Sequence, residues 1–310
     1  MEKDKGKRKY VERYSSSAKR VKMSSSGGKP MKKVFCNLKK CETNSMSWSQ
    51  RNVCVLKGDS CAATIDSPSF TREVKQPNKQ EMWFNVNGRY IRFSIAEFCL
   101  VTGLRYDGVD GRPMLDEKPS SVKDAYFKDL KVVTSEDIKR VFISLDDAPD
   151  LDVIKIGIIY LITSYLFATS YPKVVDQYIF ALVDDFATLE TFPWGRYLFE
   201  TTLLSLKKGL SKQTSHYRLI GFLVAFQVWL YEYIPALERN VATRIYKKYP
   251  RIINWTAHKH PSVSMLEDKV FGNENVVIND IDPSEVELTM PYMIGFKYEL
   301  HIYYDTKYDL

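Results

Sequence analysis

The chain has 310 residues, enough for one large domain or two small ones built around a hydrophobic core. Its 45% hydrophobic and 13% aromatic content excludes a wholly disordered or low-complexity chain. Charge is unevenly distributed: residues 1–40 hold 14 Lys/Arg and 3 Asp/Glu, a net charge of +11, whereas the rest of the chain carries −4. The sequence therefore predicts a mildly acidic globular body behind a basic arm.

The basic arm spans residues 1–33, where Lys, Arg, Ser and Gly predominate. Such a segment buries too little apolar surface to offset the entropy of ordering, so we expect it to be disordered. It contains two basic clusters, Lys7-Arg8-Lys9 and Lys19-Arg20-Val21-Lys22, spaced as in a bipartite nuclear-import signal. The arm therefore predicts an importin-type receptor as a partner and a nuclear location. The alternative is a solubilising tail.

Cysteine usage and apolar runs restrict the compartment. The five cysteines form no Cys-x-x-Cys pair and follow no apolar signal stretch, so we expect free thiols in a reducing compartment. Residues 34–78 carry most of them and are interpreted as an irregular lead-in.

The apolar runs 156–168 and 219–231 are shorter than the roughly 20 residues of a membrane span. Both predict buried core helices, and no membrane contact is expected.

Residues 81–93 carry the strongest structural signal. Asn87-Gly88 is the preferred pair for a two-residue type I′ turn between antiparallel strands. That turn sets a register in which Phe84 lies opposite Ile91 on an apolar face. The segment therefore predicts a β-hairpin.

Helix signals follow the hairpin. Ser94-x-x-Glu97 is a capping box that starts a helix ending at Gly103, and Thr134 or Ser135 caps the next one. Further helices are expected at about 153–169, 174–189, 193–208, 217–233 and 236–248. The C-terminal pattern predicts short strands at 285–288, 292–298 and 301–304, or an extended, partly ordered tail.

These elements define a mainly α fold class with a small β part. We expect a helical domain over residues 79–262 that contains the hairpin, after the arm 1–33 and the lead-in 34–78. An acidic C-terminal segment, 263–310, is expected to be partly ordered.

Several side chains of catalytic or metal-binding types are present, but not at the spacing that catalysis or metal binding requires. Cys99 lies in an apolar helix and is interpreted as a small core residue. His258-x-His260 lacks an obvious third ligand and is interpreted as a surface loop. The adjacent Asp184 and Asp185 would point about 100° apart on a helix, a poor geometry for shared acid–base work. No Gly-rich phosphate loop is present, so we expect neither a metal nor a cofactor.

A basic block spans residues 207–260, where ten Lys/Arg and two Asp/Glu give a net charge of +8. The candidate nucleic-acid contacts are Lys207, Lys208, Lys212, Arg218, Arg244, Lys247, Lys248 and Arg251. Tyrosines interleave with these cations, as in surfaces that track phosphates and stack on bases. Two alternatives stay open. In the first, the cations form a solvated face of the fold. In the second, the acidic segment after residue 263 folds back and neutralises them.

The order of landmarks between residues 80 and 255 resembles a plant-specific domain of unknown function. The landmarks include Trp83-Phe84, Val86-Asn87-Gly88, Ile91-Arg92-Phe93-Ser94, Glu97-Phe98, Val101-Thr102-Gly103-Leu104, Leu182-Val183-Asp184-Asp185-Phe186, Pro193-Trp194-Gly195, Ala225-Phe226-Gln227, and Ile234-Pro235. The resemblance implies a mostly helical, non-catalytic nuclear module from transposon-derived proteins of the Mutator-like type. In that family the domain lies upstream of a SUMO-type cysteine protease domain.

Residues of that protease type are not found in this sequence. The protease needs a His-Trp pair and a Gln followed by Asp-Cys-Gly, and neither occurs here. The sequence therefore favours a non-catalytic nuclear interaction module. A nucleic-acid-binding protein that uses the arm and residues 207–260 is one alternative. A truncated member of the protease family without its catalytic domain is the other.

Overall fold

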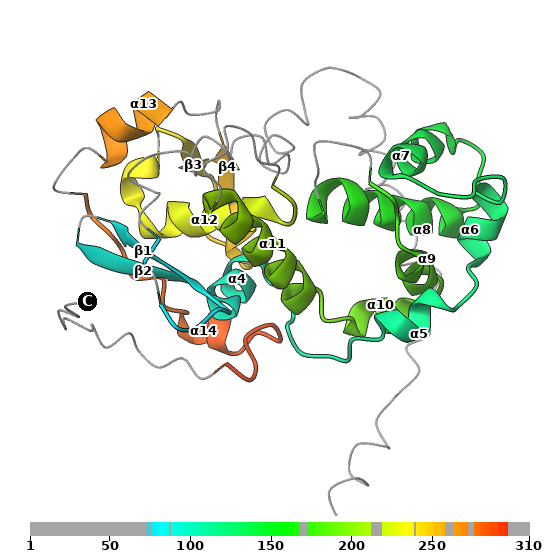
Figure 1. Cartoon of the computed structure of the whole chain (residues 1–310), viewed down its shortest axis with the longest axis horizontal. Helices are drawn as coiled ribbons and strands as arrows, with labels where there is room; N and C mark the ends of the chain where they lie inside the picture. Colours follow the sequence, from blue (N-terminus) through cyan, green and yellow to red (C-terminus); the bar gives the residue numbers. More distant parts are fainter. Residues whose placement is uncertain are drawn as a thin grey trace, which may run out of the picture.

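The computed structural model describes residues 73–74, 76–86, 88–167, 173–211, 219–238, 240–257, 263–271 and 276–296. Within these ranges helices predominate and the strands form two small antiparallel pairs, so the predicted mainly α fold class is confirmed. The elements gather in two lobes, and the long helix α11 (Trp194–Ser211) runs between them (Figure 1). The predicted arm 1–33, with both import clusters, lies outside the described residues.

The hairpin lobe, on the left of Figure 1, holds both strand pairs and the helices packed on them. Its elements are β1 (Met82–Val86), β2 (Arg89–Phe93), α4 (Ile95–Thr102), α12 (Leu223–Tyr233), a 3₁₀ turn (Pro235–Leu237), β3 (Ala242–Arg244), a second 3₁₀ turn (Arg251–Asn254), β4 (Trp255–Ala257), α13 (Val263–Leu266), a π-helical turn (Glu267–Phe271) and α14 (Glu285–Leu288).

The helical lobe lies on the right of Figure 1 and is built from the middle of the chain. Its elements are α5 (Arg112–Asp116), α6 (Ser121–Tyr126), α7 (Ser135–Ser144), α8 (Asp150–Leu161), a π-helical turn (Ile162–Leu166), α9 (Gln177–Asp184) and α10 (Phe186–Thr191). Helix α9 packs on α5, α6, α8 and α10, so it forms the centre of this lobe.

The hairpin has the predicted register, with Phe84 opposite Ile91. Its inward face is buried, and the Nε1 atom of Trp229 on α12 donates a hydrogen bond of 2.9 Å to the carbonyl oxygen of Arg92. Gly88 has a φ of 84°, which suits the tight turn, whereas Asn87 lies outside the described residues. The hairpin is therefore fixed by local turn chemistry and by contacts with α12.

The predicted capping boxes are present. Ser94 and Glu97 cap α4, which ends at Gly103 in the left-handed region with a φ of 71°. Thr134 caps α7, with Asp137 as the reciprocal partner. Local side-chain chemistry therefore sets where these helices begin.

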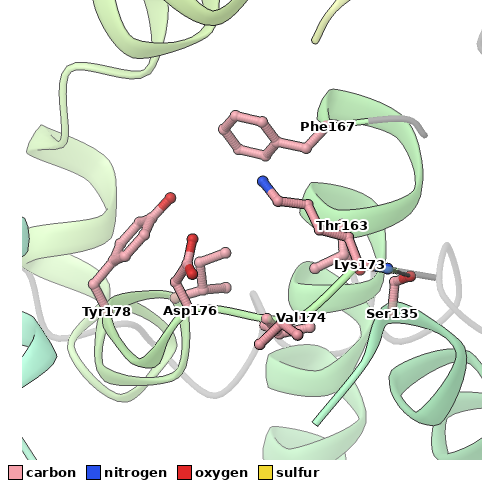
Figure 2. Close-up of a pocket in the computed structure, with 9 residues that line it drawn as sticks. Ser135, Thr163, Phe167, Lys173, Val174, Asp176 and Tyr178 are labelled. Carbon is pink, nitrogen blue, oxygen red and sulfur yellow. Dashed lines mark hydrogen bonds between the residues drawn. The ribbon is translucent and has the colours of Figure 1, made fainter. Parts of the chain in front are cut away.

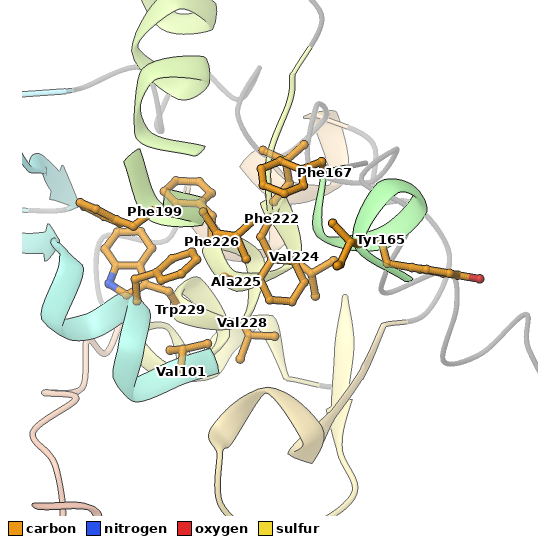
Figure 3. Close-up of a cluster of buried hydrophobic side chains, with 14 of the residues drawn as sticks. Val101, Tyr165, Phe167, Phe199, Phe222, Val224, Ala225, Phe226, Val228 and Trp229 are labelled. Atoms are coloured by element: carbon orange, nitrogen blue, oxygen red, sulfur yellow. The ribbon is translucent and has the colours of Figure 1, made fainter. Parts of the chain in front are cut away.

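The core of the hairpin lobe is aromatic. Figure 3 shows Phe199 of α11 close to Phe226 and Trp229 of α12. The Phe93 ring of β2 lies 5.0 Å from Phe226 and 5.1 Å from Trp229, between ring centroids, in edge-to-face arrangements. Every residue of α12 is buried, which explains the apolar run 219–231. Among the described residues no helix combines the length and apolar character that crossing a membrane requires.

Two predicted helix boundaries are wrong. The single helix expected at 174–189 is two helices, because the backbone of Asp185 is extended and its side chain caps α10 at the Thr188 N–H. The helix expected at 217–233 begins only at Leu223, after Gly221 with a φ of 120°. Short polar side chains and a positive-φ glycine therefore override the apolar periodicity.

The prediction for 236–248 is also wrong. The segment after the turn Pro235–Leu237 leaves the helical conformation and forms β3, in which Ala242 pairs with Ala257 of β4. Residues 285–288, predicted as a strand, form α14, capped by Ser284 and Glu287. In the first case pairing with a distant strand outweighs helix propensity, and in the second a capping box decides.

Candidate interaction surfaces

An open hollow of about 490 Å³ lies along helix α11, and we call it the α11 hollow. It is lined by Lys79, Gln80, Ile95, Tyr106, Arg196, Phe199, Glu200, Leu203, Leu204 and Lys207. Its volume falls within the range of about 300–1,000 Å³ that is usual for ligand pockets. The lining combines an apolar floor with cations, so it suits a ligand with apolar and acidic groups.

One face of α11 supplies most of this lining. The six α11 residues of the hollow follow an i, i+3, i+4, i+7, i+8, i+11 pattern from Arg196 to Lys207, which places them on one side of the helix. Phe199 turns toward the core, with its ring centroid 5.6 Å from those of Phe93 and Phe98. Leu204, in the middle of this 18-residue helix, is 56% exposed.

Cations lie toward both ends of the hollow. At one end the Nζ atom of Lys207 donates a hydrogen bond of 2.7 Å to the carbonyl oxygen of Lys79. Burial raises the pKa of the nearby Glu73, and the charge of Lys207 opposes that rise. Arg196 lies at the other end of the face. The two lysines and Arg196 outnumber Glu200 among the lining residues.

The acidic side chains near Arg196 are paired with other arginines. Arg105 holds Asp107 through a hydrogen bond of 2.9 Å, and Arg112 holds Asp110 at 2.8 Å. These hydrogen bonds lower the pKa of both carboxyl groups, and the charge of Arg196 lowers them further. The acids near Arg196 are therefore already held by other arginines.

A second hollow, of about 480 Å³, lies between α12 and α14, and we call it the α12–α14 hollow. Its charged lining residues are Glu232, Glu238, Arg244, Lys247, Lys248, Arg251, Asp280, Asp282 and Glu287. Acids outnumber bases in this set, although the residues come from both the basic block and the acidic C-terminal segment. The hollow is therefore not a cationic groove of the kind that follows a phosphate backbone.

A buried network forms its floor. The carboxylate of Glu232 accepts hydrogen bonds from Trp255 Nε1 at 2.6 Å and from Arg244 Nη2 at 3.0 Å, and lies 3.5 Å from Arg251 Nη1. Arg251 also donates two hydrogen bonds to Glu287, from Nε to Oε1 at 2.7 Å and from Nη2 to Oε2 at 2.8 Å. The network therefore joins α12, the segment 244–255 and α14.

The network favours the charged form of the Glu287 carboxyl group. Burial alone would raise the pKa of its carboxyl group, but hydrogen bonds from Arg251 and from the backbone of Ser284 hold the pKa below its usual range. The side chain of Glu287 is 1% exposed and that of Arg251 is 12% exposed. The pair is therefore an internal connection rather than a surface contact.

The structure separates the cations that sequence reasoning grouped together. Lys207 and Lys208 lie on α11, whereas Arg244, Lys247, Lys248 and Arg251 line the other hollow. Lys212 and Arg218 lie outside the described residues. Arg244 and Arg251 are engaged in the network with Glu232, and residues 280–287 supply three of the acids beside them. Lys247 and Lys248 stay exposed, with the Lys248 Nζ atom 4.8 Å from the Tyr246 ring centroid.

Reactive side chains in the described residues have structural surroundings. Cys99 is buried, and burial raises the pKa of its thiol far above the usual range. Asp184 accepts hydrogen bonds from Lys155 Nζ at 2.7 Å and from the hydroxyl groups of Ser120 and Ser121. In the part of the chain that the structure describes, no three His, Cys, Asp or Glu residues gather as a metal site would require. The predicted loop His258–His260 lies outside that part.

A third crevice, in the helical lobe, is too small for a ligand. Figure 2 shows Lys173, Asp176 and Tyr178 around it, with Phe167 above the lysine. Its volume is about 10 Å³, roughly the space of one water molecule. We therefore exclude it from the candidate sites.

Comparisons with known proteins place the α11 hollow inside a recognised domain. A family model described as "Domain of unknown function (DUF1985)" matches residues 70–205. Protein MAIN-LIKE 2 of Arabidopsis thaliana is 23% identical over 250 residues, which cover 74% of this chain and 36% of that protein. The chain thus spans little more than a third of the length of this relative. No solved structure matches.

These matches support a plant domain of unknown function, in agreement with the resemblance found in the sequence. All residues that line the α11 hollow, apart from Lys207, fall inside the matched range. Sequence reasoning missed this hollow because it grouped residues by charge along the chain. The stripe Arg196, Phe199, Leu203 and Lys207 was the available signal, since it sets two apolar residues between two cations at helical spacing.

Proposed function

We propose that this chain is a non-catalytic interaction module that acts in the nucleus and that contacts its partner through the α11 hollow. The observation that carries the proposal is the exposed Leu204, which lies among cations in a hollow of ligand-binding size. An exposed apolar residue inside a concave, charged rim is typical of a protein-binding surface.

The surroundings of the ionisable groups support the non-catalytic part of the proposal. A general acid or nucleophile needs an accessible group with a pKa near the working pH. Here burial moves the pKa of Cys99 away from that range, and hydrogen bonds hold the pKa of Asp184 below its usual range although burial opposes them. Glu97 is buried in the capping box of α4. These groups stabilise the fold.

The nuclear part of the proposal is supported by the two basic clusters of the arm, Lys7–Lys9 and Lys19–Lys22. A transposon-derived origin is supported by the order of the landmark residues between 83 and 235. Both rest on sequence pattern alone.

We expect a fluorescent fusion of the full chain to accumulate in plant nuclei. Scattering the six cations of the two clusters through the arm at constant net charge should abolish this enrichment. Two weak electrostatic contacts joined by a flexible segment reinforce each other only while both clusters are intact. A control that exchanges Ser15–Ser17 for glycines should stay nuclear. Nuclear enrichment of the scattered variant would show that the arm is a general polycation.

A nucleic-acid contact is the second candidate function. It is favoured by one observation, the exposed pair Lys247 and Lys248 between the exposed rings of Tyr246 and Tyr249. Exposed aromatic rings beside cations stack on bases and pair with phosphates. The acids Asp280 and Asp282 across the same hollow repel phosphates and make this candidate weaker.

A further inference from the structure

We propose that the α11 hollow binds an amphipathic helix of a partner protein, and that this helix carries acidic side chains near both ends of a short apolar stripe. The proposal rests on the proposed role as an interaction module and names the chemistry of its partner. It follows from the length of the hollow, the position of its apolar residues and the placement of its cations.

The apolar part of the hollow occupies its middle. Phe199 and Leu203 form the buried floor, Ile95 of the neighbouring helix is partly buried, and Leu204 projects with 56% of its surface exposed. Side chains of a docked helix at positions i, i+3 or i+4, and i+7 meet such a floor.

The cations set the length and the charge of the partner. Arg196 and Lys207 are eleven positions apart on one helix, so their Cα atoms are separated by about 16 Å along the axis. Eleven residues are close to three full turns, so the two cations lie nearly in line along α11, with Leu203 on that line and Leu204 about 60–80° to one side of it. Lys79, whose carbonyl oxygen accepts the hydrogen bond from Lys207, also lines the hollow. A helix lying along α11 therefore meets positive charge about three turns apart and apolar surface between.

The same geometry disfavours a nucleic acid in this hollow. Its centre offers Leu203, Leu204 and the buried ring of Phe199, and Glu200 lies among them. A carboxylate in the middle repels a continuous line of phosphates. It tolerates a peptide whose acids lie only at the two ends.

The test is a selection on the full chain from a displayed library of Ala-rich helical peptides about five turns long. The peptides are randomised along one face, and binders are counter-selected against Leu204→Arg. We expect enriched peptides to carry Glu or Asp at two positions about three turns apart, with Leu, Ile, Met or Phe between them. Enrichment of neutral or basic peptides, or of none that distinguish the wild type from Leu204→Arg, would overturn the proposal.

The best peptide then tests the charges by fluorescence anisotropy. Arg196→Glu and Lys207→Glu should each weaken its binding about tenfold, and replacing the facing peptide acid by Lys should restore affinity for the matching variant. Lys128→Glu, an exposed lysine in the helical lobe, is the control and should leave the affinity unchanged. Equal binding by all variants would overturn the assignment of the cations. The role as an interaction module is judged separately, from the nuclear proteins that neighbour the full chain.

Discussion

Glu232→Ala is expected to lower the free energy of unfolding by about 3–5 kcal/mol, because it removes one member of a buried ion-paired network and takes the acceptor from Arg244 and from Trp255 Nε1. The side chain of Glu232 is 6% exposed and accepts bonds from Arg244 and from Trp255 Nε1. After the substitution the indole N–H loses its acceptor, and Arg251 keeps only Glu287 as an ionic contact in the network. Urea denaturation followed by circular dichroism measures the change.

Glu238→Ala is the matched control. Glu238 lines the same hollow and carries the same charge, but it is only half-buried and lies outside the Glu232 network. Its replacement should change the free energy of unfolding by less than about 1 kcal/mol. Equal losses for the two variants would mean that the network around Glu232 contributes nothing specific.

Gly221→Ala is expected to destabilise the chain by about 2–5 kcal/mol, at the junction between α11 and α12. Gly221 has a φ of 120°, and a Cβ atom there would lie 2.6 Å from Thr202 Oγ1 and 2.9 Å from Thr202 Cα. The strained backbone costs about 1–2 kcal/mol, and forcing the two segments apart adds about 1–3 kcal/mol. The hydrogen bond of 2.9 Å from the Phe222 N–H to Thr202 Oγ1 would be lost with the shift.

Gly88→Ala separates these two causes. Gly88 also has a positive φ, of 84°, but a Cβ atom there would meet nothing within 4 Å. Its replacement should therefore cost only the backbone term, about 1–2 kcal/mol. Thermal melts of both variants give the comparison. A Gly221→Ala melting temperature equal to that of Gly88→Ala would contradict the close contact between Gly221 and Thr202.

Elements that depend on neighbouring residues were predictable from the sequence. The turn at Gly88 fixes the register of the hairpin, and Ser94 with Glu97 fixes the start of α4, because each signal acts over a few residues. The capping box of Ser284 and Glu287 is a signal of the same kind. It was present in the sequence, although residues 285–288 were predicted to form a short strand or an extended tail.

Features that depend on distant residues were not predictable. Strand β3 forms inside a segment predicted to be helical, because Ala242 pairs with Ala257 and Arg244 lies over the Trp255 ring, 5.3 Å from its centroid. Lys79 and Lys207 meet across 128 positions of sequence. Composition shows how many cations a segment holds. The fold decides which of them, such as Arg251, are used internally.

The contact surface within the matched domain is the central claim. If the proposed surface is correct, replacing Leu204 should abolish partner binding and leave the fold intact, because its side chain is 56% exposed. The second candidate function, nucleic-acid binding, instead assigns the contact to Lys247 and Lys248. The two surfaces lie on different hollows and can be altered separately.

The most direct test is proximity labelling in plant nuclei with the full chain fused to a labelling enzyme. Wild type, Leu204→Arg, the double variant Lys247→Glu/Lys248→Glu and the control Lys128→Glu are compared at equal expression. We predict that Leu204→Arg reduces the labelling of a reproducible set of nuclear proteins about tenfold or more, whereas the other two variants retain it. Labelling that survives Leu204→Arg but is lost in the double lysine variant would contradict the account and assign the contact surface to the α12–α14 hollow.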